Sequence, residues 1–150
     1  MNVLQQEQAA LDQFIELLQQ EQAALVAADV DKLQSLSELK QQLSEHLNTL
    51  AQQRVAQQER AGYSADASGT RAWLAAQPPA VGDAWKKLLA TAQTARDLNQ
   101  TNGQLIQTHM QHNQQALSVL MGAANRLDVY GADGQPLSGP GGGQRIIGKA

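Results

Sequence analysis

The stretch Val3–Leu33 reads VLQQEQAALDQFIELLQQEQAALVAADVDKL and decides the fold class. Leucines recur in it every seven residues, at Leu4, Leu11, Leu18 and Leu25. Such a repeat places one apolar stripe along an α-helix, which we predict over about residues 3–27. Asp29 follows directly and precedes a second periodic run, whose first N–H groups its carboxylate can cap. A connection this short forces the two helices into an antiparallel hairpin.

The second helix is predicted over residues 30–60. Its apolar positions also follow a heptad, at Leu33, Leu36, Leu43, Leu47 and Leu50. Lys40 occupies one position of this seam, within about one helical turn of Glu21 on the facing seam. An ion pair between Lys40 and Glu21 would fix the register of the hairpin. The alternative, which the sequence favours slightly, is that both side chains extend to solvent.

A break and then a third, longer helix follow. Gly62, Gly69 and Pro78-Pro79 mark residues 62–79 as a connection, in which we expect one short helix over 70–76. The third helix is predicted over residues 80–128. Its seam comprises Trp85, Leu88, Ala92, Ala95, Asn99, Asn102, Ile106 and His109, with further leucines on both sides. A stripe this broad suggests packing against two helices.

The third helix would be longer than the hairpin that it packs against. At 1.5 Å per residue it spans about 73 Å, against about 46 Å for the second helix. Its C-terminal third would therefore extend beyond the hairpin. The apolar residues there, which we take as a candidate binding surface, are Leu117, Leu120, Met121, Ala124 and Leu127. The alternative is that this stripe is buried against the first helix or the 62–79 connection.

The predicted fold is therefore all-α: an antiparallel helical hairpin plus a long third helix, as in a three-helix coiled-coil-like bundle. Residues 1–130 form one domain. Residues 131–150 contain seven glycines and two prolines, which cannot hold a helix in water, and we expect a flexible tail.

Composition excludes several classes of function. The net charge is −3, and the first 31 residues carry six acidic and no basic residues, so a nucleic-acid partner is not expected. There is no cysteine, no signal peptide and no apolar run long enough for a membrane, which predicts a cytoplasmic protein. His109 and His112 share a helix face but have no carboxylate at helical spacing. We therefore expect no enzyme, no cofactor and no metal site.

The middle of the third helix is unusually polar. Asn99, Asn102 and Asn113 occupy seam positions, and Gly103 costs a helix roughly 1 kcal/mol relative to Ala. Buried amides require hydrogen-bond partners. A polar layer that sets helix register explains these residues, with Gly103 allowing another helix to approach closely.

The run Leu98–Ile106, LNQTNGQLI, resembles the N-x-x-N-G-x-L-I signature of the FlgN family of flagellar export chaperones. The matching residues are Asn99, Asn102, Gly103, Leu105 and Ile106. Trp85 stands upstream of the signature, and Tyr130-Gly131 follows the third helix where the family tends to carry a tyrosine and a glycine. The resemblance covers about residues 4–134.

This resemblance implies a cytoplasmic chaperone for the hook-associated proteins of the hook–filament junction. It would cover their C-terminal amphipathic helices with its own C-terminal helical region, and so prevent premature association. It would then dock at the flagellar type III export gate, with Tyr130 at the matching position and the export ATPase as a candidate further partner. The alternative is a structural coiled-coil module that oligomerises through the third helix, without a specific export client.

Overall fold

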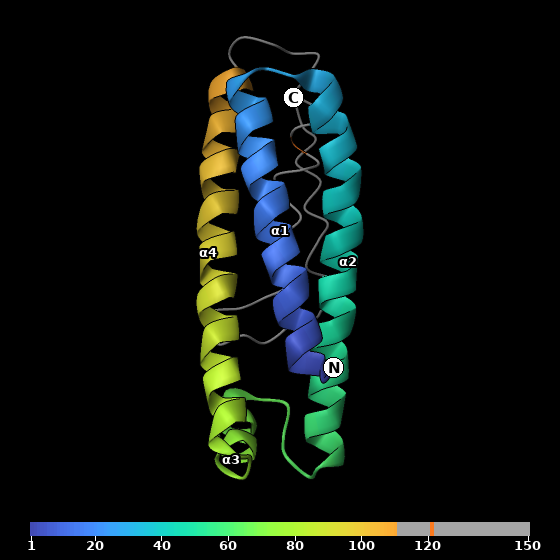
Figure 1. The fold of residues 1–150 in the computed structure, drawn as a ribbon, viewed down its shortest axis with the longest axis vertical. Coiled ribbons are helices and arrows are strands. Elements are labelled where there is room, and N and C mark those ends of the chain that lie inside the picture. Colours follow the sequence, from blue (N-terminus) through green and yellow to red (C-terminus); the bar gives the residue numbers. More distant parts are fainter. Residues whose placement is uncertain (111–120, 122–150) are drawn as a thin grey trace, which may run out of the picture.

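Residues 1–110 and Met121 are described by the computed structural model, in which the helices stand side by side along one long axis (Figure 1). The helices of this part are α1 (Val3–Val26), α2 (Val30–Arg60), α3 (Ala67–Ala75) and α4 (Pro79–Met110). α1 and α2 form an antiparallel hairpin, and α4 runs parallel to α1 (Figure 1). The described residues contain helices and no strand, so the prediction of an all-α fold is confirmed.

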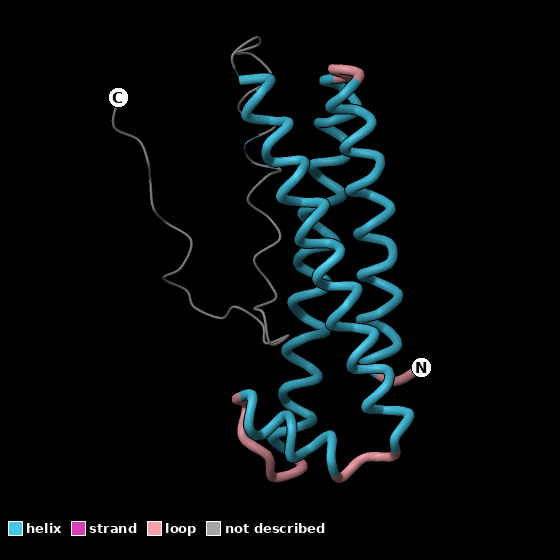
Figure 2. Tube along the Cα trace, turned by 90° about the vertical axis from the view of Figure 1, so that its left-hand side faces the viewer, coloured by secondary structure: helices cyan, strands magenta, loops and turns pink. Residues whose placement is uncertain are grey.

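α1 is the central helix of the bundle. It packs against α2 on one side and α4 on the other, whereas no Cα atoms of α2 and α4 lie within 8 Å of each other in the described residues. The short α3 contacts both α2 and α4 at the end opposite the hairpin loop (Figure 2). We expected the third long helix to pack against two helices: α4 packs closely on α1 and reaches α2 through side chains, at Lys40–Asn99 and Arg54–Trp85. The helix with two close long neighbours is α1, and its buried positions cover a wider arc than one heptad seam.

Side-chain caps fix the ends of the hairpin helices. Asn2 and Gln5 form a reciprocal capping box at the start of α1, with N–H···O distances of 2.9 and 3.0 Å. The Asp29 carboxylate accepts from the Lys32 N–H at 3.1 Å and begins α2 at the predicted residue. α1 ends at Val26, one residue early, because the chain reverses through Ala28 in the left-handed region with φ 52°.

α3 begins three residues before the predicted position because Asp66 caps it. The Asp66 carboxylate accepts from the Gly69 N–H and from the Ser64 hydroxyl, each at 2.7 Å. These hydrogen bonds hold the pKa of Asp66 below its ordinary value, the Gly69 bond most strongly. A Cβ on Gly69 would overlap the Ser64 carbonyl, so the turn requires glycine here. The Thr70 hydroxyl then donates to Gln58 Oε1 at 3.1 Å and ties α3 to α2.

The core consists of two apolar clusters. The larger one, nearer the α3 end, is built from Leu11, Phe14, Leu47, Trp85 and Leu88 among others. The smaller one, nearer the hairpin loop, contains Leu25, Leu33, Leu36 and Ile106. Between the two clusters lie polar side chains of all three long helices, which form the site described below.

α4 begins at Pro79, one residue before the expected start, and is described as far as Met110. Proline is well suited to a first helical turn because its missing N–H would have no partner there. The remainder of the predicted third helix, Met121 excepted, and the predicted tail over 131–150 lie outside the described residues.

Candidate functional site

A buried ion pair joins α1 to α2 between the two apolar clusters. Lys40 Nζ donates to the Glu21 carboxylate, with distances of 3.1 Å to Oε1 and 3.3 Å to Oε2. Both side chains are buried, with 0% of the Lys40 side chain and 1% of the Glu21 side chain exposed. The interpretation that both side chains extend to solvent was therefore wrong. It failed because α4 covers the pair, which the pattern of the hairpin alone does not reveal.

The two asparagines of α4 complete this layer. Lys40 Nζ donates to Asn99 Oδ1 at 2.6 Å. Asn102 Nδ2 donates to Glu21 Oε1 and to the backbone carbonyl of Leu18, each at 2.9 Å. Residues three apart on a helix share a face, so the N-x-x-N spacing presents both amides to the ion pair. We call Glu21, Lys40, Asn99 and Asn102 the polar layer.

The polar layer stabilises the fold only when all four of its side chains are present. Removing two charges from water costs several kcal/mol each, and their attraction compensates only with additional hydrogen bonds. Asn99 supplies the acceptor that the ammonium needs, and Asn102 supplies a donor for the carboxylate. Any shift of α4 by one turn would separate these groups. The layer therefore sets the register of α4 on the hairpin.

A second buried ion pair repeats the arrangement fourteen residues away on both hairpin helices. Arg54 Nε donates to Glu7 Oε2 at 2.8 Å, and both side chains are almost fully buried. The Arg54 guanidinium also lies 4.6 Å from the centre of the Trp85 ring on α4, a cation–π contact. Sequence reasoning missed this pair, although the equal spacing from Glu7 to Glu21 and from Lys40 to Arg54 could have indicated it.

The other residues of the signature lie at the α4 surface or in the smaller cluster. Ile106 is buried, whereas Leu105 and Gly103 are half-buried. No atom lies within 4 Å of the position that a Cβ on Gly103 would take. Within the described part of the chain, Gly103 therefore serves no close helix contact, contrary to our expectation. It lines a surface hollow of about 420 Å³ together with Asn99, Gln107 and Met121.

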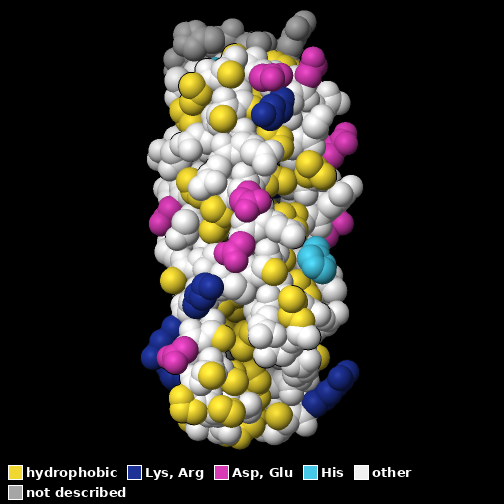
Figure 3. Space-filling model, in the orientation of Figure 1, with side chains coloured by type: hydrophobic (Ala, Val, Ile, Leu, Met, Phe, Trp, Pro, Cys, Tyr) yellow, Lys and Arg dark blue, Asp and Glu magenta, His cyan; other side chains and the backbone are white. Residues whose placement is uncertain are grey.

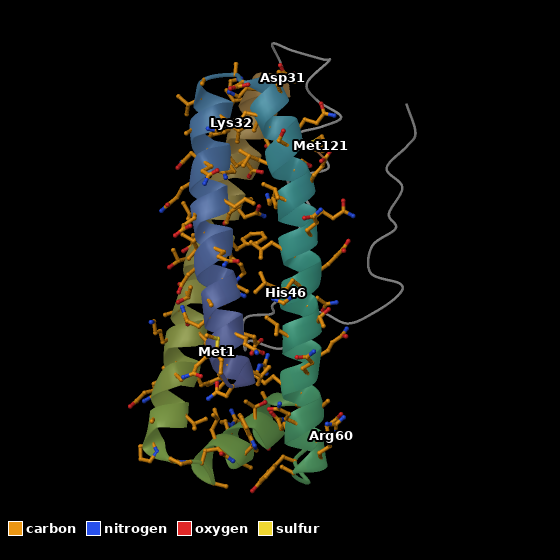
Figure 4. All side chains as sticks on the ribbon, turned by 45° about the vertical axis from the view of Figure 1, so that its right-hand side comes forward. Met1, Asp31, Lys32, His46, Arg60 and Met121 are labelled. Atoms are coloured by element: carbon orange, nitrogen blue, oxygen red, sulfur yellow. The ribbon has the colours of Figure 1, made fainter. Side chains whose placement is uncertain are left out.

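Most residues of the predicted binding surface fall on undescribed positions. Leu117, Leu120, Ala124 and Leu127, and the predicted docking residue Tyr130, lie outside the described residues. Met121 is described, and its side chain is 40% exposed (Figure 4). His109 is half-buried, and its predicted neighbour His112 is also outside the described part.

Within residues 1–110 and Met121, no three His, Cys, Asp or Glu side chains are grouped as metal ligands would be. No helix in that part is both long and apolar enough to cross a membrane.

Comparison with known proteins gives a consistent result. The family model described as FlgN protein matches residues 1–138. The flagella synthesis protein FlgN of Yersinia enterocolitica serotype O:8 is 32% identical over 141 residues, covering 88% of this chain and 90% of the relative. That of Salmonella typhimurium is 32% identical over 146 residues, covering 96% and 94%. No solved structure matches the chain significantly.

Replacing Lys40 by Met should destabilise the protein by about 3–5 kcal/mol, because it leaves the Glu21 carboxylate buried without its cation. Adding Glu21→Leu to Lys40→Met should recover part of this loss. Urea unfolding followed by circular dichroism measures both changes. The control Lys32→Met alters an exposed lysine and should shift stability by less than about 0.5 kcal/mol. Equal small effects at Lys40 and Lys32 would contradict the role given to the polar layer.

Gly103→Ala should stabilise the protein by roughly 0.5–1 kcal/mol, since alanine is the better helix former and the Cβ meets open space. Gly82→Ala on the same helix is the matched control, because no atom lies within 4 Å of its Cβ position either. The same urea titration reports both. If Gly103→Ala lowers the stability while Gly82→Ala raises it, another segment contacts Gly103.

Proposed function

The chain belongs to the FlgN family, and we propose that it is a flagellar export chaperone. In this proposal it acts in the cytoplasm and binds the C-terminal amphipathic helices of hook-associated proteins. It prevents these helices from associating before export and delivers the clients to the type III export gate. Binding and release of a helix involve no catalytic step.

The observation that carries this proposal is the extent of the family match. It covers residues 1–138, and so includes the apolar stripe of Leu117, Leu120, Met121, Ala124 and Leu127, and Tyr130. The relatives are named flagella synthesis proteins, and each is aligned over at least 90% of its length. The family assignment therefore rests on nearly the whole chain rather than on the Asn-Gly signature alone.

The chemistry of the stripe supports a role in helix binding. Its residues are spaced three and four apart, which places them on one face of a helix. An amphipathic client helix would bury its own apolar face against such a stripe. Met121 is already 40% exposed, and a methionine side chain adapts well to the varied surfaces of different clients.

The core of the described residues is built by the three long helices. The apolar positions of α1 are covered by α2 and α4, and the core clusters of the described part comprise residues up to Ile106. In this proposal a client binds and leaves residues 117–127 while the Val3–Met110 scaffold stays folded.

Substitution of Leu120 and Leu127 by Asp should abolish co-purification with C-terminal segments of hook-associated proteins, because two charges would enter an apolar contact. We expect affinity to fall at least about tenfold, measured by calorimetry. Val26→Asp is the matched control, since Val26 is 71% exposed on α1 and far from the stripe in sequence. Failure of the unaltered chain to bind any such segment would overturn the proposal. A tight symmetric oligomer that covers residues 117–127, seen by light scattering, would favour the structural module instead.

Tyr130→Ala should abolish export of the clients while their binding stays unchanged, because the proposal assigns gate docking to Tyr130 and client binding to the stripe. A secretion assay and a pull-down on the same variant measure the two effects. Tyr130→Phe as a control separates the ring from its hydroxyl. Loss of client binding in Tyr130→Ala would refute this division of roles.

A further inference from the structure

An open groove runs between α1 and α2 (Figure 4). It encloses about 380 Å³, and its lining includes Leu17 of α1 and Leu39 and Leu43 of α2. Leu39 is 51% exposed in the middle of a long helix, although an apolar side chain of this size gains about 1.5–3 kcal/mol from burial. Figure 4 labels His46 at the same groove.

The groove exists because nothing covers this flank of the hairpin in the described structure. The pair of helices has two flanks, and α4 packs only along the α1 side that carries the polar layer. On the open flank, Leu39, Leu43 and His46 follow one another at helical spacing along α2. Gln13, Leu17 and Gln20 do the same along α1. Two parallel rows of this kind form the seat that a third helix would use in a bundle.

The rims of the groove are acidic. Glu16 lines the groove from α1, and Glu38 and Glu45 are exposed on α2, each within about one helical turn of the lining residue Gln42. Figure 3 shows acidic side chains over α1 and along the outer edge of α2, with the histidine between the two helices. α1 carries no lysine or arginine, and the ammonium of Lys40 is buried against Glu21. The nearest exposed cation along this flank is Lys32, at the hairpin-loop end (Figure 4).

We propose that this α1–α2 groove is a docking site for a basic amphipathic helix of a partner protein. Apolar residues of that helix, spaced three and four apart, fill the groove over Leu17, Leu39 and Leu43. Its flanking lysines and arginines face the carboxylates of Glu16, Glu38 and Glu45. A second copy of this chain fits less well, because two acidic rims would repel each other.

This docking site is made of other residues than the apolar stripe at residues 117–127. The groove belongs to the described hairpin, and the stripe lies beyond α4 in the sequence. The inference therefore does not depend on the client-binding proposal. A chain whose groove is blocked should still bind its clients.

The test uses the full chain and a synthetic helical peptide with leucines at positions i, i+3, i+4 and i+7 and lysines on both flanks. A matched peptide carries glutamate in place of every lysine. Fluorescence anisotropy should show binding of the lysine peptide, weakening with added salt, and no binding of the glutamate peptide. Equal binding of both peptides would overturn the proposal.

Leu39→Asp is the decisive variant. It adds a carboxylate to an acidic surface, so non-specific attraction of the lysine peptide would grow, whereas docking in the groove should weaken at least about tenfold. The double variant Glu16→Lys, Glu45→Lys should also weaken binding. Glu59→Lys is the control, because Glu59 is exposed fourteen residues beyond Glu45, about 21 Å further along α2, and should leave binding unchanged. All the altered residues are exposed, so the fold should persist, and circular dichroism checks this.

Two other occupants would each overturn the assignment to a partner helix. If the peptide binds only after residues 144–150 are deleted, the groove belongs to the chain's own basic C-terminal segment. If the chain forms a dimer and Leu39→Asp makes that dimer dissociate, the groove is an interface between two copies. Unchanged peptide binding by Leu39→Asp would show that the groove is not the site.

Discussion

The arrangement of the three long helices depends on the buried carboxylate of Glu21. It accepts hydrogen bonds from Lys40 of α2 and from Asn102 of α4, so one charged group on the central helix holds both neighbours. Apolar contacts tolerate small sliding movements, because one leucine can replace another in the same stripe. A buried charge does not tolerate such movements, since the loss of one partner costs several kcal/mol of stability. The apolar clusters supply the driving force for folding, and Glu21 selects the register in which they meet.

The way in which α2 and α4 meet leaves a surface of the described bundle open. The gap between α2 and α4 is bridged by the long side chains of Lys40 and Arg54 rather than by close helix packing. α1 consequently takes the central place, with α2 and α4 as its two flanking helices (Figure 1). Among the described residues, the α1–α2 pair keeps one flank without a neighbouring helix, and the groove with the exposed Leu39 lies on that flank.

Much of the fold could be predicted from local pattern, and the failures have a common cause. The leucine heptads and the Asp29 cap placed the hairpin to within a residue, because both signals lie within one helix or one turn. The prediction that Glu21 and Lys40 extend to solvent was wrong because their burial depends on α4, which lies some sixty residues further along the chain. The groove was missed for a related reason. Leu39 does not belong to the heptad seam, and only the placement of α4 shows which flank of the hairpin stays open.

The hydrogen bonds of the two signature asparagines show what these residues do in the bundle. An asparagine offers both an acceptor and donors on a short side chain. Asn99 uses the acceptor toward the ammonium of Lys40, and Asn102 uses a donor toward the carboxylate of Glu21. Aspartate could not donate to Glu21 in its ionised form, and leucine would leave both charges short of a partner. The N-x-x-N spacing is therefore accounted for by the ion pair that it completes. These amides are therefore used within the bundle, and in the described residues the signature serves the scaffold.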